Sequence, residues 1–162
     1  MKLYHGTNCD IVTVDLKIGA KYKDFGQGFY LTPDRATAAR MAFKKARLFG
    51  GQPTLITYEF DESAMSSNLK IKQFSKIATV EWMKFIAAHR NKDSKDVIQI
   101  YDIVSGPIAD DGVVLTLTNF QEGIYTPEQA AALLQDKYLD QQYYFGSQVA
   151  LTYLTKEKVE IV

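Results

Sequence analysis

The chain has 162 residues and carries 19 basic against 19 acidic side chains, so its formal net charge is zero. This length suffices for one hydrophobic core, which predicts a single domain over residues 1–162. The 46% hydrophobic content argues against a disordered protein, and the neutral charge argues against a protein that coats nucleic acid.

A single cysteine, Cys9, excludes an internal disulfide and a multi-cysteine zinc site, and we expect it to be buried or incidental. With two histidines in the chain, we expect no multi-histidine metal centre. The N-terminal segment turns polar too early for a signal peptide, and no apolar run approaches the ~20 residues that span a bilayer. These features predict a cytoplasmic protein with no membrane partner.

The first half of the chain begins with a short strand and a long loop. Lys2–His5 is predicted as the strand, residues 7–28 as the loop, and Phe29–Thr32 as a short apolar segment. A helix follows, for which Thr32 is the expected N-cap and Pro33 the first residue. We expect this helix to run to about Phe49 and to end at Gly50 and Gly51.

The middle of the chain alternates between strand and helix patterns. Apolar residues at helical spacing predict a helix over 76–91. The predicted strands are Thr54–Phe60, the weaker Leu69–Phe74, and Val97–Val104, which a Ser-Gly-Pro turn ends.

The remaining segments are short. Val113–Thr118 is ambiguous, because its β-branched residues favour a strand whereas the flanking Asp110-Asp111 and Gly123 favour a helix. A capping box at Thr126–Gln129 predicts a helix to about Gln135. We expect a strand, a short helix capped by Ser147, and a closing strand, at Gln142–Phe145, Ser147–Leu154 and Val159–Val162. Because strands and helices do not alternate regularly, the fold class is α+β.

The neutral charge is distributed unevenly. Residues 1–95 hold 16 basic and 9 acidic side chains, whereas residues 96–142 hold 1 basic and 8 acidic. Two interpretations stay open: the two parts neutralise each other in the fold, or they form a dipolar cleft.

Of the two histidines, His89 is predicted to be partly buried or to interact with its helix end. His5 lies at a strand end beside Gly6, where both its side chain and the backbone can reach a ligand. No Gly-x-Ser-x-Gly elbow, P-loop or complete dinucleotide fingerprint occurs.

Three segments carry a family resemblance. Leu3–Thr7 resembles the His-Gly-Ser/Thr strand of the diphtheria-toxin/poly(ADP-ribose) polymerase branch of ADP-ribosyltransferases, and Asp24–Thr32 resembles its Gly-x-Gly-[Ile/Phe]-Tyr segment. Asp140–Phe145 falls where that branch has its third motif. More closely, nearly the whole chain resembles DUF3990, a group of small bacterial proteins that share the Asp-Ile-Val-x-Gly-Pro pattern, here Asp102–Pro107.

The resemblance implies an ADP-ribosyltransferase-like split antiparallel β core with flanking helices, and NAD as the cofactor. His5 would bind a ribose, the Gly6 backbone would bind the nicotinamide carboxamide, and the Tyr30 ring would stack on nicotinamide. Thr7 and Gly28, in the same two motifs, are also expected to contact NAD. Cleavage of the nicotinamide–ribose bond would pass through an oxocarbenium-like state.

The third motif departs from the pattern, because Gln142 stands where the branch normally has Glu. An amide can bind a ribose hydroxyl but brings no net charge to stabilise the developing cation. Asp140 would share a strand face with Gln142 in a regular strand and could supply the carboxylate. We accordingly expect His5, Tyr30 and Gln142 as catalytic residues of a mono-ADP-ribosyltransferase, not of a polymerase.

The helix after the Tyr30 motif is basic. Its basic side chains either form a solvent-exposed face, or some of them, such as Arg40, bind the NAD pyrophosphate. The partners expected are NAD, a protein or nucleic-acid acceptor, and an antitoxin if the protein is a bacterial toxin rather than an effector. Two alternatives are a catalytically silent module that binds NAD or ADP-ribose, and an NAD hydrolase of the same fold.

Overall fold

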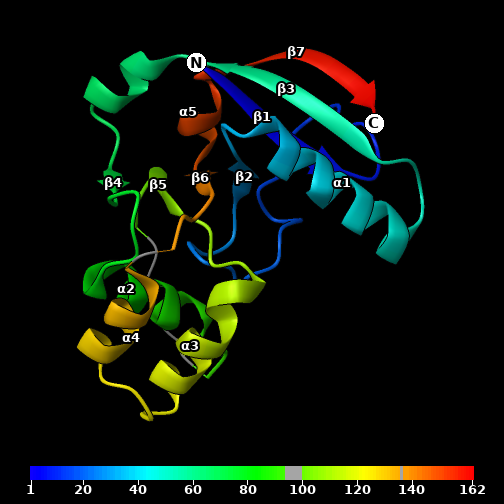
Figure 1. Cartoon of the computed structure of the whole chain (residues 1–162). Coiled ribbons are helices and arrows are strands. Elements are labelled where there is room, and N and C mark those ends of the chain that lie inside the picture. The colour runs from blue at the N-terminus through cyan, green and yellow to red at the C-terminus, as the bar shows by residue number, and fades with distance from the viewer. Residues whose placement is uncertain (94–99, 136) are drawn as a thin grey trace.

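The computed structural model describes residues 1–93, 100–135 and 137–162. Strands and helices are interspersed in an α+β arrangement (Figure 1). The strands are β1 (Lys2–Thr7), β2 (Phe29–Leu31), β3 (Thr54–Phe60), β4 (Ile71–Gln73), β5 (Ile103–Pro107), β6 (Gln141–Phe145) and β7 (Leu154–Ile161). The helices are α1 (Arg35–Phe49), α2 (Val80–Arg90), α3 (Asp111–Gln121), α4 (Pro127–Leu134), α5 (Gln148–Leu151) and the 3-10 turn η1 (Glu62–Ser66).

The strands form two sheets. One has the order β1-β3-β7 and is antiparallel, and the other has the order β2-β6-β5-β4, in which only the β4–β5 pair is parallel. An antiparallel bridge between Tyr4 and Thr32 joins β1 to β2, and therefore links the two sheets. Segments from the start, middle and end of the chain meet at this junction.

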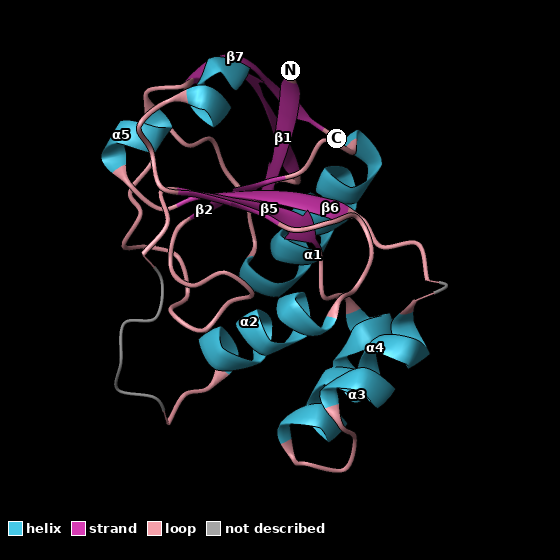
Figure 2. Cartoon of the chain, turned by 90° about the vertical axis from the view of Figure 1, so that its left-hand side faces the viewer, coloured by secondary structure: helices cyan, strands magenta, loops and turns pink. Residues whose placement is uncertain are grey.

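Two hydrophobic clusters lie on the two faces of the second sheet. Neighbouring residues of a strand point to opposite faces, so Tyr144 packs into one cluster and Phe145 into the other. The Tyr144 cluster includes the buried side chains of α2, α3 and α4, such as Trp82 and Leu117. Figure 2 shows β2, β5 and β6 edge-on, with these three helices below them. The Phe145 cluster fills the space toward β1 and β3.

Several predicted elements need correction at their ends. The N-cap of α1 is Asp34, not Thr32, because the Asp34 carboxylate accepts from the backbone N–H groups of Ala36 and Thr37. The Ser-Gly-Pro segment is not a turn but the end of β5, while the predicted strand Val97–Val104 lies partly outside the described residues. Val113–Thr118 lies within α3 and is helical. The last strand starts earlier than predicted, at Leu154.

Candidate functional site

The three predicted catalytic residues come from three strands that meet at the junction of the sheets. His5 is on β1, Tyr30 on β2 and Gln142 on β6. The β2–β6 register pairs Tyr30 with Tyr144, two residues from Gln142, so the side chains of Tyr30 and Gln142 share one face of the second sheet. His5 contacts the Tyr30 backbone directly. The fold thus brings together residues that are far apart in the sequence.

The His5 ring is held by three neighbours. Its Nδ1 lies 2.7 Å from the Tyr30 carbonyl oxygen, which can only accept, so Nδ1 carries the proton. The ring stacks on Phe29 with centroids 4.6 Å apart. Its Nε2 is left as an acceptor, 3.4 Å from the Lys45 ammonium nitrogen. Burial, and then the charge of Lys45, lower the pKa of His5 to about 3, so the imidazole is neutral at neutral pH.

This neutral histidine should make the stability depend on pH. Between pH 6.5 and about 3 the unfolded chain protonates His5 whereas the folded chain does not. The free energy of unfolding should therefore fall as the pH drops through this window, by up to about 1.4 kcal/mol per pH unit. His5→Asn retains a donor for the Tyr30 carbonyl but does not titrate.

Urea unfolding of both proteins between pH 7 and 4 measures the difference. We expect the wild type to lose more stability than His5→Asn over this range. Equal losses in the two proteins would contradict the assignment of His5 as a half-buried, neutral imidazole.

The Gly6 backbone faces the gap where β1 diverges from β2. Both peptide groups of Tyr4 bond to Thr32, so Tyr4 and Gly6 direct their N–H and C=O groups away from β3 and toward β2. A continued ladder would pair the Gly6 N–H with the Tyr30 carbonyl. His5 Nδ1 occupies that carbonyl instead. One donor and one acceptor of Gly6 therefore point to the junction of the sheets.

Packing alone explains why positions 6 and 28 are glycines. A Cβ at Gly6 would lie 2.0 Å from the Ala38 carbonyl oxygen of α1. A Cβ at Gly28 would lie 2.3 Å from the Tyr144 ring. Thr7, the other residue predicted to bind NAD, is buried at the end of β1. For these residues the contact with NAD stays a prediction.

The Tyr30 hydroxyl organises the loop that precedes β2. It donates to the Gly26 carbonyl at 2.6 Å and accepts from the Phe25 N–H at 3.0 Å. The ring packs edge-on against Tyr144 at 5.3 Å, and the Lys23 ammonium lies 4.9 Å from its centroid. Burial raises the pKa of the Tyr30 phenol well above its usual value.

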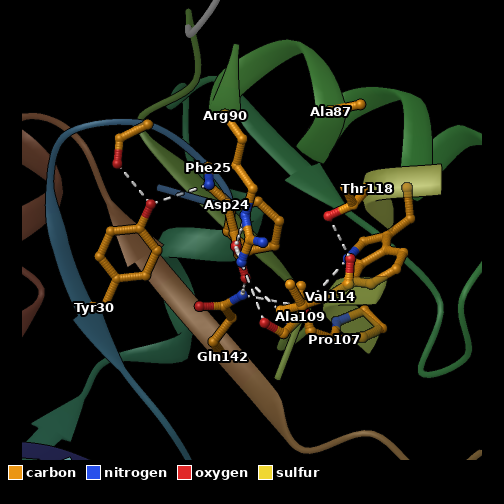
Figure 3. A network of polar contacts seen from close by, with 12 residues as sticks. Asp24, Phe25, Tyr30, Ala87, Arg90, Pro107, Ala109, Val114, Thr118 and Gln142 are labelled. Atoms are coloured by element: carbon orange, nitrogen blue, oxygen red, sulfur yellow. Dashed lines mark hydrogen bonds and ion pairs between the residues drawn. The ribbon is translucent and has the colours of Figure 1, made fainter. Parts of the chain in front are cut away.

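Gln142 is buried and belongs to a network of polar contacts (Figure 3). Its Nε2 donates to the Asp24 carboxylate at 2.8 Å and to the Pro107 carbonyl at 3.1 Å. Arg90, at the end of α2, binds the other oxygen of Asp24 through Nε and a terminal nitrogen, at 2.9 and 2.5 Å. The Ala109 N–H adds a fourth donor to Asp24.

Asp24, Arg90, Lys23 and Lys45 are the functional candidates that sequence reasoning missed. Asp24 precedes the Gly-x-Gly segment, but its contact with Gln142 spans 118 positions, which no local pattern encodes. Lys45 was visible only as one of several basic residues on a helix.

Lys23 and Lys45 place two positive charges beside His5 and Tyr30. Burial, and then the charge of Lys23, lower the pKa of Lys45 to about 8, and burial also lowers the pKa of Lys23. Neither lysine forms an ion pair with an acidic residue within the described residues. Two half-buried ammonium groups of this kind favour an anion between or beside them.

Arg40 and Asp140 are paired with each other. An Arg40 terminal nitrogen lies 2.8 Å from the Asp140 carboxylate, which also contacts the Thr37 hydroxyl. Asp140 lies just before β6, and its carboxylate joins that strand to α1. We expected Asp140 to provide a carboxylate beside Gln142, but its carboxylate contacts Arg40 and Thr37 of α1 instead. This ion pair also compensates the charge of Arg40.

The remaining sequence candidates lie elsewhere. His89 is buried, and its Nδ1 contacts the Phe85 carbonyl, as expected for a histidine near its helix end. Cys9 is exposed, so of the two expectations, a buried or an incidental thiol, burial does not apply. Among the described residues, no group of His, Cys, Asp and Glu is placed to hold a metal ion, and no helix is long and apolar enough to cross a membrane.

The surface of the molecule has two notable hollows. One of about 620 Å³ lies at the C-terminal end of α2 beside α3. The other, of about 200 Å³, lies on the first sheet, between β1 and β7. Neither is lined by His5, Tyr30 or Gln142, although Arg90 lines the first. The candidate site is recognised by its contacts.

Comparison with known proteins yields one match. The model of a family described as "Protein of unknown function (DUF3990)" matches residues 1–155. No curated protein and no solved structure matches the chain.

Proposed function

We propose that the chain, which belongs to the DUF3990 family, is an NAD-dependent mono-ADP-ribosyltransferase. The observation that carries the proposal is the junction of β1, β2 and β6. There, the Tyr4–Thr32 bridge brings the Gly6 peptide groups to the side of β2, and the Asp24 carboxylate and the Pro107 carbonyl hold the Gln142 amide. The two sheets and this placement also support an ADP-ribosyltransferase-like split β core.

The groups at the junction are complementary to NAD. A carboxamide offers an acceptor oxygen and a donor NH2 group, which match the N–H and C=O of Gly6. The diphosphate of NAD would bind Lys23 and Lys45, which form no ion pair with an acidic side chain among the described residues, in place of the expected Arg40. The Tyr30 ring would contact the nicotinamide, and His5 Nε2 would accept from a ribose hydroxyl.

The proposed reaction breaks the bond between the nicotinamide nitrogen and the ribose carbon. The electron pair of that bond leaves with nicotinamide, which becomes neutral. A hydroxyl or amine of the acceptor attacks the same ribose carbon and releases its proton to water. The Gln142 amide oxygen would accept from the ribose 2′-hydroxyl and so stabilise the positive charge that develops on the sugar.

Gln142 also favours a second candidate function, a module that binds NAD or ADP-ribose without turning it over. Its amide is neutral, and Arg90 compensates the carboxylate behind it. NAD hydrolysis is the outcome if water replaces the acceptor. A macromolecular acceptor, protein or nucleic acid, and an antitoxin partner belong to the proposal of a toxin or effector.

Incubation with NAD labelled in its adenylate part, with and without cell lysate, tests the proposal. We expect label on a macromolecule, released nicotinamide, and at least tenfold less of both with Gln142→Met or Tyr30→Ala. Tyr138→Ala, at a 91% exposed position, is the matched control and should retain activity. Free ADP-ribose without transfer would support the hydrolase instead. Thermal stabilisation by NAD without any product would support the silent module and overturn the transferase.

A further inference from the structure

The buried contacts of Gln142 fix which way its amide points. Both partners of the Nε2 group, the Asp24 carboxylate and the Pro107 carbonyl, can only accept. A flipped amide would place its oxygen against two acceptors, so this orientation is the favourable one. Figure 3 shows the Gln142 oxygen on the side away from Pro107, toward Tyr30.

The Gln142 oxygen is free to accept. Within the described residues, this Oε1 has no hydrogen-bond partner. Among these residues, the one buried side-chain atom without a partner is His89 Nε2, so the Gln142 oxygen is not fully buried. It is therefore accessible at the junction of β2 and β6. The contacts of Nε2 with Asp24 and Pro107 therefore determine that Gln142 presents an acceptor at this place.

Asp24 in turn is held by four donors. Its Oδ1 accepts twice from Arg90, and its Oδ2 accepts from Gln142 and from the Ala109 N–H. Each oxygen thus acts only as an acceptor, a role that a carboxylate fills and an amide does not. Arg90 compensates the charge, so the site contains one buried carboxylate and one cation behind a neutral amide.

We propose that Asp24, anchored by Arg90, is a positioning residue that orients Gln142, and that position 142 therefore requires an amide and not a carboxylate. A glutamate there would place one oxygen, in the position of Nε2, against both the Asp24 carboxylate and the Pro107 carbonyl, at the 2.8 and 3.1 Å now bridged by N–H groups. What the oriented oxygen does, accepting from a ribose hydroxyl, rests on the proposed function.

The test exchanges the amide of Gln142 and the carboxylate of Asp24, first at position 142 alone and then at both positions together. Gln142→Glu alone should lower the melting temperature at pH 7.5 by at least about 3 °C. The folded carboxylate pair retains a proton that the unfolded chain has lost, so the stability of this variant relative to wild type should rise as the pH falls from 7.5 to 5.5. Gln73→Glu, the same change at an exposed strand position, should leave the melting temperature nearly unchanged.

In the double variant Asp24→Asn with Gln142→Glu, the amide at position 24 can donate to the carboxylate at position 142, so a donor again faces an acceptor. It should recover part of the lost melting temperature and restore the pH dependence of wild type, although the Ala109 N–H then loses its acceptor. In the NAD assay, Gln142→Glu should turn over at least tenfold more slowly than wild type, and the double variant should recover turnover.

The outcomes separate the two proposals. If Gln142→Glu is as stable as wild type at every pH, or if the double variant is no better than the single one, the positioning role is overturned. If wild type shows no turnover but the stability pattern holds, the proposed function fails and the positioning of Gln142 stands.

Discussion

Replacement of Arg90 by methionine should lower the free energy of unfolding by about 3 kcal/mol, at the lower end of the 3–5 kcal/mol typical when a buried ion pair loses one partner. Asp24 is 7% exposed, so its charge has almost no access to water once the guanidinium is gone. The Arg90 side chain itself is 28% exposed, which limits the loss. Urea unfolding at pH 7 measures the effect.

The controls separate the charge from the volume of the side chain. Arg47→Met, at an exposed position of α1, should change stability by less than about 0.5 kcal/mol. Asp24→Asn combined with Arg90→Met should recover much of the loss, because the neutral amide can still accept from Gln142. A loss below about 1 kcal/mol in Arg90→Met would mean that Asp24 does not depend on this ion pair.

The helices were predictable where local chemistry determines them. The capping box of α4 forms as predicted, with the Thr126 side chain accepting from the Gln129 N–H. For the ambiguous segment before it, the Asp110 carboxylate caps Gly112 and nucleates α3 despite the β-branched residues that follow. End signals outweighed intrinsic strand propensity there, because the helix buries Val113 and Leu117 in the core.

The strands were harder, because their partners are distant in sequence. Gly106 and Pro107 read locally as a turn, yet both pair with β6. Gly106 leaves room for Phe74, to which a Cβ would approach within 2.9 Å, and the Pro107 carbonyl accepts from Trp82 and Gln142. These contacts arise only when β5 lies between β4 and β6, so no window of sequence contains them.

The candidate site also combines features that local sequence predicts with contacts between distant residues, which it does not predict. The motifs identified His5, Tyr30 and Gln142, but the residues that hold them came from elsewhere in the chain. The predicted partner of Gln142 was Asp140, two residues away on the same strand, whereas the observed partner is Asp24 in the loop before β2. Strand periodicity placed Asp140 beside Gln142, but Arg40 and Thr37 draw its carboxylate toward α1.

The uneven charge follows from several local causes. Asp110, Asp111 and Glu128 of the acidic segment lie at the N-termini of α3 and α4, where negative charge is favourable. The ion pair between Arg40 and Asp140 joins the basic and acidic segments. The positive half of the expected dipolar cleft is represented by Lys23 and Lys45 beside His5, whereas the carboxylate nearest Gln142 comes from the basic segment itself.

Gly6→Ala should destabilise the fold by about 3 kcal/mol or more, because an added Cβ meets backbone and not a flexible side chain. The Ala38 carbonyl oxygen would lie at 2.0 Å and the Ala42 nitrogen at 2.8 Å, so α1 as a whole must move away from β1. That movement also displaces Lys45, which α1 holds beside His5. Urea unfolding and thermal stabilisation by NAD should therefore both decline in this variant.

Gly112→Ala is the matched control for this substitution. Its Cβ would meet only the Asp110 carboxylate at 3.2 Å and the Lys137 ammonium at 3.9 Å, both at the ends of side chains that can adjust. Because alanine favours a helix over glycine, stability should stay within about 1 kcal/mol of wild type. If Gly6→Ala were equally well tolerated, the close packing of α1 on β1 would be wrong, and with it the reason for glycine at position 6.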